Sequence, residues 1–191
     1  MKKLSLCLVL AVLPFSASAS FLSEDAPPAN ISGAGSSFET AFSPPVALSP
    51  TVVKAIDSAT KSVRVSARAF NSKAVSEALF RAYRNNKDVK VVLSRKSNSG
   101  VYSASQFLLT MSMEPHVTRS DDGLYADYIV IDEKDVVEGN IAGFTDEEDE
   151  KKNAGEVLII HDAPELAKRY LAHWQTQWDA SDAMKQEKEK N

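Results

Sequence analysis

This chain of 191 residues has almost no cysteine, no long apolar run and no excess of basic residues. Its single cysteine, Cys7, cannot build a disulfide scaffold. The apolar run from Leu4 to Phe15 has about twelve residues, fewer than the roughly 20 of a membrane-spanning helix. The 22 Lys and Arg against 26 Asp and Glu give a net charge of −4, so net charge does not attract nucleic acid or anionic lipid. With 43% hydrophobic and 25% charged residues, the composition predicts one soluble globular domain.

The first nineteen residues have the three parts of a secretory signal peptide. Lys2 and Lys3 precede the apolar run, and Ala17-Ser18-Ala19 supplies the small residues of a cleavage site. We expect cleavage after Ala19 and export to the periplasm or the medium; an uncleaved anchor is the alternative. The mature chain then has no thiol and a net charge of −6, because two lysines and no acids leave with the leader.

Charge is unevenly distributed along the chain. Residues 51–100 contain eleven Lys and Arg against three acids, whereas residues 119–162 contain four Lys and Arg against fourteen acids. Such opposed blocks favour self-association or a charged partner. The alternative is two solvated surfaces that partly neutralise each other.

Composition divides the chain into a signal peptide at 1–19, a flexible arm at 20–41, a folded domain at 42–178 and a disordered polar tail at 179–191. The arm mixes Pro, Gly, Ser and Asn without an apolar period. In the domain, helical apolar spacing alternates with short runs rich in Val and Ile, which predicts α/β layers. The expected helices cover 49–59, 72–82, 104–113 and 162–178, and the expected strands cover 63–70, 89–93, 129–131, 136–137 and 157–160.

Three of the expected helices have N-terminal capping signals. Ser49 precedes Pro50, and Ser72 precedes an apolar period. Asp162 with Glu165 predicts a capping box at the start of the last helix. We interpret the apolar stripe of that helix as core rather than as a cofactor contact; it consists of Leu166, Tyr170, Leu171, Trp174 and Trp178.

Four segments carry a family resemblance: AIDSATKSVRVSARAF, VSEALFRAYRNNKDVKVVLSRKSNSG, ADYIVIDEKDVVEGNIAGFT and KNAGEVLIIHDAPELAKRYLAHWQTQW. In this order they resemble the phospholipase D-like superfamily, in particular its short bacterial endonucleases with a single catalytic motif. The resemblance spans 42–178 and implies one domain with a mixed β-sheet flanked by helices on both faces. It also implies metal-free chemistry by a His-x-Lys-x-x-x-x-Asp motif, in which His attacks phosphorus, Lys holds phosphate oxygens and Asp supports a histidine.

The motif is degenerate in this chain. When the alignment is anchored on Asp132 as the family Asp, the His position falls on Tyr125 and the Lys position on Asp127. The Gly-Ser-x-Asn segment that follows in the family corresponds to Gly139-Asn140-Ile141-Ala142, which keeps only the glycine in place. Asn153 fits a polar position shortly after the motif.

These replacements oppose phosphoryl transfer, which needs a nucleophile and cations aimed at the phosphate oxygens. Asp127 in place of Lys exchanges an attraction for a repulsion. A tyrosine such as Tyr125 is almost wholly protonated at neutral pH and lacks the base strength of imidazole. The acidic run 146–150 adds further negative potential after the motif.

No metal or cofactor site is expected. His116, His161 and His173 are not spaced as metal ligands. The acidic run 146–150 lacks the alternating ligands and turn glycine of a calcium loop. The loop Ser94–Gly100 lacks the phosphate-loop pattern and is interpreted as a connection.

Together these features predict a secreted or periplasmic phospholipase D-like protein without catalysis, serving as a binding or assembly component of the cell envelope. Relatives of this branch accompany mobile elements and conjugation machinery, so the resemblance implies an envelope partner in conjugation or secretion. One alternative is a periplasmic endonuclease or phospholipase with an altered active site. Another is a nucleic-acid module using Arg64 and Arg68, although the net charge leads us to expect weak binding or none.

The resemblance further implies a homodimer. Single-motif relatives join two motifs across a two-fold axis, which places residues 125–132 at the interface. On such an axis Asp127 approaches its symmetry mate, so the dimer is expected to tighten as the pH falls towards 5.

Overall fold

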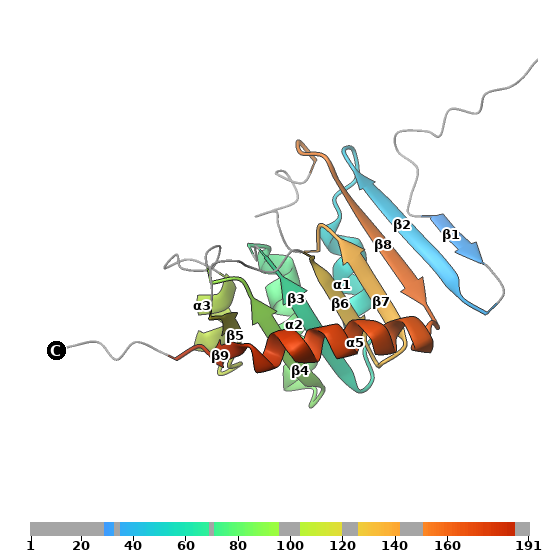
Figure 1. The fold of residues 1–191 in the computed structure, drawn as a ribbon. Helices are drawn as coiled ribbons and strands as arrows, with labels where there is room; N and C mark the ends of the chain where they lie inside the picture. Colours follow the sequence, from blue (N-terminus) through green and yellow to red (C-terminus); the bar gives the residue numbers. More distant parts are fainter. Residues whose placement is uncertain are drawn as a thin grey trace, which may run out of the picture.

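The computed structural model describes residues 29–32, 35–68, 71–95, 104–119, 126–141 and 151–185. These residues form one mixed β-sheet with helices on both faces (Figure 1). The strands are β1 (Ala29–Ser32), β2 (Ser37–Ser43), β3 (Ser62–Ala67), β4 (Asp88–Leu93), β5 (His116–Thr118), β6 (Tyr128–Ile131), β7 (Asp135–Gly139), β8 (Gly155–His161) and β9 (Ser181–Ala183). The helices are α1 (Ser49–Asp57), α2 (Lys73–Arg84), α3 (Ala104–Thr110) and α5 (Pro164–Asp179).

The nine strands lie in the order β1-β2-β8-β7-β6-β3-β4-β5-β9. The pairs β3/β4 and β4/β5 are parallel, and the remaining neighbours are antiparallel. The parallel pairs are connected through α2 and α3, as crossover connections require. The expectation of a single α/β domain with a mixed sheet is therefore confirmed.

Both faces of the central strands are buried, so their sequences are nearly continuous apolar runs. On one face Val63 and Ile129 pack with α1 and α2 in the larger core cluster. On the other face Tyr128 and Val130 pack under α5, where Trp174 is buried and its indole N–H donates to the Val65 carbonyl at 2.9 Å. Trp174 is thus a core residue, as predicted. Among the described residues, no helix combines the length and apolarity needed to cross a membrane.

Two predicted segment boundaries are wrong. Residues 29–32 and 37–43 of the expected flexible arm form β1 and β2, and β2 pairs with β8 along its whole length. Residues 181–183 of the expected tail form β9 on β5. β1 and β9 are the two edge strands of the sheet, and β2 lies between β1 and β8. All three are held by backbone hydrogen bonds to neighbouring strands, so they need no strong apolar period. The arm residues 20–28, the leader 1–19 and the tail residues 186–191 lie outside the described residues.

Helix capping agrees with the sequence at one of three sites. Ser72 is the N-cap of α2, and its hydroxyl accepts from the Val75 N–H. Helix α1 begins at Ser49 itself, after Leu48. Asp162 does not cap α5: its backbone has a positive φ of 52°, Ala163 precedes the helix, and the Asp162 carboxylate instead pairs with Lys134 at 3.1 Å. The tight turn after β8 turns this side chain towards the β6–β7 hairpin.

Candidate functional site

A polar cleft of about 280 Å³ lies beside the degenerate motif. It is formed where β3 ends and β6 begins, together with parts of β7 and β8 on the sheet face that carries α5. We call it the motif cleft. Its lining residues are Arg68, Ala126, Asp127, Glu138, Gly139, Asn140, Glu156 and Leu158.

Asp127 holds the position that the resemblance assigns to the phosphate-binding lysine. Its nearly buried carboxylate accepts from the Arg68 backbone N–H at 2.6 Å, and it lies 3.3 Å from the Arg68 guanidinium. Arg68 follows β3 directly, so this contact joins the end of β3 to the start of β6. Arg68, the arginine among the described lining residues of the motif cleft, is therefore engaged by Asp127.

Two further acids in the motif cleft were not predicted as site residues. Glu138 pairs with Leu158 across the β7/β8 ladder, which aligns Glu138, Glu156 and Leu158 on one face of the sheet. The Tyr170 hydroxyl of α5 donates a short hydrogen bond to Glu138. Burial and this acidic partner raise the pKa of Tyr170 to about 12. With Asp127, the cleft presents three carboxylates against one guanidinium.

Gly139 and Asn140 shape the floor of the motif cleft. Gly139 has a φ of 106°, and a Cβ there would lie 2.2 Å from the Glu156 carbonyl oxygen. The next residue, Asn140, donates its backbone N–H to the same carbonyl at 2.8 Å. Glycine persists here because neither the backbone conformation nor the approach of β8 leaves room for a side chain.

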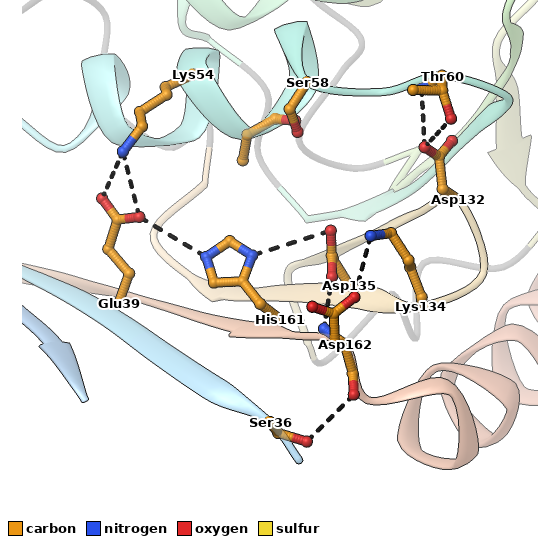
Figure 2. Close-up of polar contacts among 11 residues, drawn as sticks. Ser36, Glu39, Lys54, Ser58, Thr60, Asp132, Lys134, Asp135, His161 and Asp162 are labelled. Carbon is orange, nitrogen blue, oxygen red and sulfur yellow. Dashed lines mark hydrogen bonds and ion pairs between the residues drawn. The ribbon is translucent and has the colours of Figure 1, made fainter. Parts of the chain in front are cut away.

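Asp132 lies at the opposite end of β6 from Asp127. Five residues of extended chain span about 16 Å, so the two motif acids cannot act on one phosphate. The Asp132 carboxylate accepts from the Thr60 hydroxyl at 2.6 Å and from the Thr60 backbone N–H at 2.8 Å (Figure 2). It also accepts from the backbone N–H groups of Lys61 and Ser62 at 2.7 and 2.9 Å. Burial raises the pKa of this carboxyl, but the four hydrogen bonds outweigh it and lower the pKa to about 2. Within the described part of the chain, the hydrogen-bond partners of Asp132 thus all belong to residues 60–62, and through them Asp132 anchors the start of β3.

The remaining predicted residues are dispersed. Arg64 lies within β3, whereas Arg68 follows the last residue of this strand. The Arg64 side chain is only 15% exposed, pairs with Asp88 and lies 5.5 Å from the Trp174 ring centroid. Asn153 lies before β8, where its carbonyl accepts from the Ser43 hydroxyl at 3.0 Å. Tyr125, the acidic run 146–150 and residues 96–100 of the serine-rich loop lie outside the described residues.

In the described part of the chain, no three His, Cys, Asp or Glu side chains converge as metal ligands. The motif cleft can accept hydrogen bonds and attract cations through its carboxylates. Among the described residues that line it, the cation is Arg68, which is paired with Asp127.

Fold and cleft together define a phospholipase D-like α/β protein. Nuc from Salmonella typhimurium, a phospholipase D family member, has a TM-score of 0.72 and 26% identity over 79% of this chain and 99% of that one. NucT from Helicobacter pylori has a TM-score of 0.61 and 16% identity, over 77% and 99% of the two chains.

Sequence comparison leads to the same family. Phospholipase D of Rickettsia bellii is 30% identical over 139 residues, which cover 73% of this chain and 68% of that protein. Phospholipase D of Rickettsia prowazekii is 27% identical over 149 residues, 78% and 71% of the two chains. No protein-family model matches the chain. The chain belongs to the phospholipase D family.

Proposed function

We propose that this phospholipase D-like chain is a secreted or periplasmic binding or assembly component that does not hydrolyse phosphodiesters. One observation carries the proposal: Asp127 occupies the position of the phosphate-binding lysine and holds Arg68 in an ion pair. Glu138 and Glu156 add two more negative charges to the same cleft.

The carboxylates of the motif cleft repel a phosphodiester. Two unit charges 4 Å apart interact by about 4 kcal/mol at the effective dielectric constant of a protein surface. A phosphate oxygen beside Asp127 meets repulsion of this order, whereas a lysine there would attract it equally strongly. Arg68 offsets part of the repulsion only by giving up its own partner. The same acids and the engagement of Arg64 with Asp88 favour weak binding of nucleic acid or none.

We expect the purified mature chain to show no hydrolysis of bis(4-nitrophenyl) phosphate above the buffer rate, with or without Mg²⁺. The reason is the loss of both the imidazole nucleophile and the lysine from the motif. Release of nitrophenolate is followed by absorbance, with Tyr125→Phe and Asp127→Asn variants beside the parent. Turnover by the parent that Tyr125→Phe abolishes would support the alternative of an enzyme with an altered active site and refute the proposal.

We further propose a homodimer formed around the motif cleft. Beside it, Phe42 of β2 and Leu158 of β8 are 58% and 36% exposed on a part of the sheet face that α5 leaves open. Pairing this face would bury both side chains. Because Arg68 pairs with Asp127, the repulsion between symmetry-related Asp127 side chains is smaller than the sequence suggested, and only a small effect of pH is now expected.

Sedimentation velocity at tens of micromolar, at pH 5 and pH 8, is expected to show a dimer for the parent chain. Phe42→Asp is expected to give a monomer, because it places a charge in the apolar interface. Tyr83→Asp, at an exposed aromatic of α2, serves as the matched control and should leave the dimer intact. A parent chain that is monomeric at both values of pH contradicts the dimer.

Export through cleavage after Ala19 is proposed from the leader alone. When the full chain is expressed with its leader in a Gram-negative host, the periplasmic or secreted product should begin at Ser20. Mass spectrometry of the intact product measures this. A product that retains residues 1–19 and stays with the membrane would instead indicate an uncleaved anchor.

A further inference from the structure

A second cavity, of about 450 Å³, lies on the sheet face opposite the motif cleft. It is bordered by α1, by the start of β2 and by the end of β8, and it opens to solvent. Glu39 and His161 point to this face, because side chains alternate along a strand and Glu156 and Leu158 point to the other. We call it the α1 cavity. Its lining residues are Ser37, Glu39, Thr51, Lys54, Ala55, Ser58 and His161.

Glu39 is a buried carboxylate with only long contacts to its partners. The residue is 7% exposed. The Lys54 Nζ lies 3.4 and 3.5 Å from its two oxygens, and the His161 Nε2 lies 3.7 Å away (Figure 2). Hydrogen bonds between an ammonium and a carboxylate are normally about 2.7–2.9 Å long. Glu39 therefore retains the capacity to accept a closer donor from the cavity.

Thr51 adds a second unsatisfied group to the α1 cavity. It is 6% exposed, and within the described part of the chain its hydroxyl has no hydrogen-bond partner. Most buried hydroxyls are paired with a protein group or an ordered water, and a ligand that enters the cavity can take the place of that water. Thr51 and Lys54 are three residues apart on α1 and so face the same side of the helix.

The charge around His161 favours a cationic ligand. Its ring lies between Glu39 and Asp135, whose Oδ2 is 3.9 Å from Nδ1, and Asp135 is itself buried. Lys134 is held by Asp162 at 3.1 Å, which leaves Lys54 as the cation nearest to Glu39 (Figure 2). The Lys54 side chain is 72% exposed, so it can move into solvent at little cost.

We propose that the α1 cavity binds a small primary ammonium compound. The N–H donors of the ligand replace the Lys54 ammonium at Glu39, and the Thr51 hydroxyl is a further acceptor in the cavity. A primary ammonium suits the site because it combines positive charge with three donors and is small relative to 450 Å³. The proposal is independent of the motif cleft and of any reaction there.

The test is a titration of the ¹⁵N-labelled chain with n-propylammonium, followed by NMR. We expect saturable shift changes at millimolar concentration, confined to α1, β2 and the end of β8. Tetramethylammonium, which has the same charge without N–H donors, should produce none. The absence of saturable shifts from n-propylammonium, equal binding of tetramethylammonium, or shifts centred on the motif cleft would each overturn the proposal.

Variants distinguish this site from a general attraction of cations. Glu39→Gln should weaken binding at least about tenfold, because it removes the charge-assisted acceptor. Lys54→Ala should tighten binding, by up to about fivefold, because it removes the internal competitor. Lys73→Ala, at an exposed lysine of α2 in a 3.8 Å pair with Glu77, is the matched control and should leave affinity unchanged.

Thermal unfolding shows which variants are folded. If Glu39→Gln does not fold, Lys54→Ala and Thr51→Val decide the question. Thr51→Val should weaken binding severalfold, because it replaces an acceptor by a methyl group. Weaker binding by Lys54→Ala, or unchanged affinity in Thr51→Val, would contradict the proposed contacts. Ammonium binding in the α1 cavity is measured without any hydrolysis assay. Failure of this proposal and failure of the proposal for the motif cleft are therefore distinguishable.

Discussion

Replacing Asp132 with alanine is expected to lower the free energy of unfolding by about 2–4 kcal/mol. Its carboxylate accepts four hydrogen bonds from Thr60, Lys61 and Ser62. A hydrogen bond to a charged group contributes about 1.5–3 kcal/mol net, and the solvent exposure of this site keeps the combined loss well below the sum of four such bonds. Urea unfolding at pH 7 measures the change. Asp182→Ala, at an exposed carboxylate paired with Arg119, is the control and should change stability by less than about 1 kcal/mol.

The same carboxylate should make stability depend on acid pH. The pKa of Asp132 is lowered from 3.8 to about 2 on folding, so the unfolded chain binds more protons between these values. Its contribution is therefore complete above about pH 4 and is lost as the pH falls towards 2. After allowance for solvent screening, the loss is about 1–2 kcal/mol. Asp132→Asn should flatten this part of the profile; a parent profile that is level between pH 4 and 2 would contradict the assignment.

Gly139→Ala is expected to destabilise the chain by about 3 kcal/mol or more. The new Cβ would lie 2.2 Å from the Glu156 carbonyl oxygen, so β7 and β8 must move apart, and the φ of 106° adds backbone strain. The change also displaces Asn140, which shares that carbonyl.

Gly35 offers a matched control because its φ is 99° but a Cβ there would meet no atom within 4 Å. Gly35→Ala carries the backbone strain alone and should cost about 1–2 kcal/mol. Thermal or urea unfolding of the two variants isolates the steric part of the Gly139 effect. Equal destabilisation by both would show that the contact with β8 does not matter.

Local sequence patterns determined much of the architecture. The Val and Ile runs located β4, β6, β7 and β8. In β6 and the first half of β7 the apolar run is continuous because both faces are buried. The stripe on α5 identified Trp174 as core, and the serine before α2 identified its cap. The succession of segments indicated the phospholipase D family, and the resemblance assigned the lysine position of its motif to Asp127.

Pairing between segments distant in sequence determined the remaining strands and the role of Asp132. β1, β2 and β9 exist because a neighbouring strand offers free backbone groups, and their own side chains carry little apolar period. Asp132 is aligned with the last residue of the family motif, yet its hydrogen-bond partners lie some 70 residues earlier in the chain. Only its position at the far end of β6 shows that it stabilises β3 and takes no part in the motif cleft.

The two polar sites depend on register in the same way. Glu138 and Glu156 enter one cleft because β7 and β8 pair with Glu138 opposite Leu158. Glu39 meets His161 because β2 lies antiparallel to β8, with Ser37 opposite His161. A shift of one residue in either pairing would turn these side chains to the other face of the sheet. Helices, strands and candidate polar residues could therefore be predicted from residue types and local periods in the sequence. The convergence of distant charged residues depended on strand register, because register is set by the packing of the whole sheet.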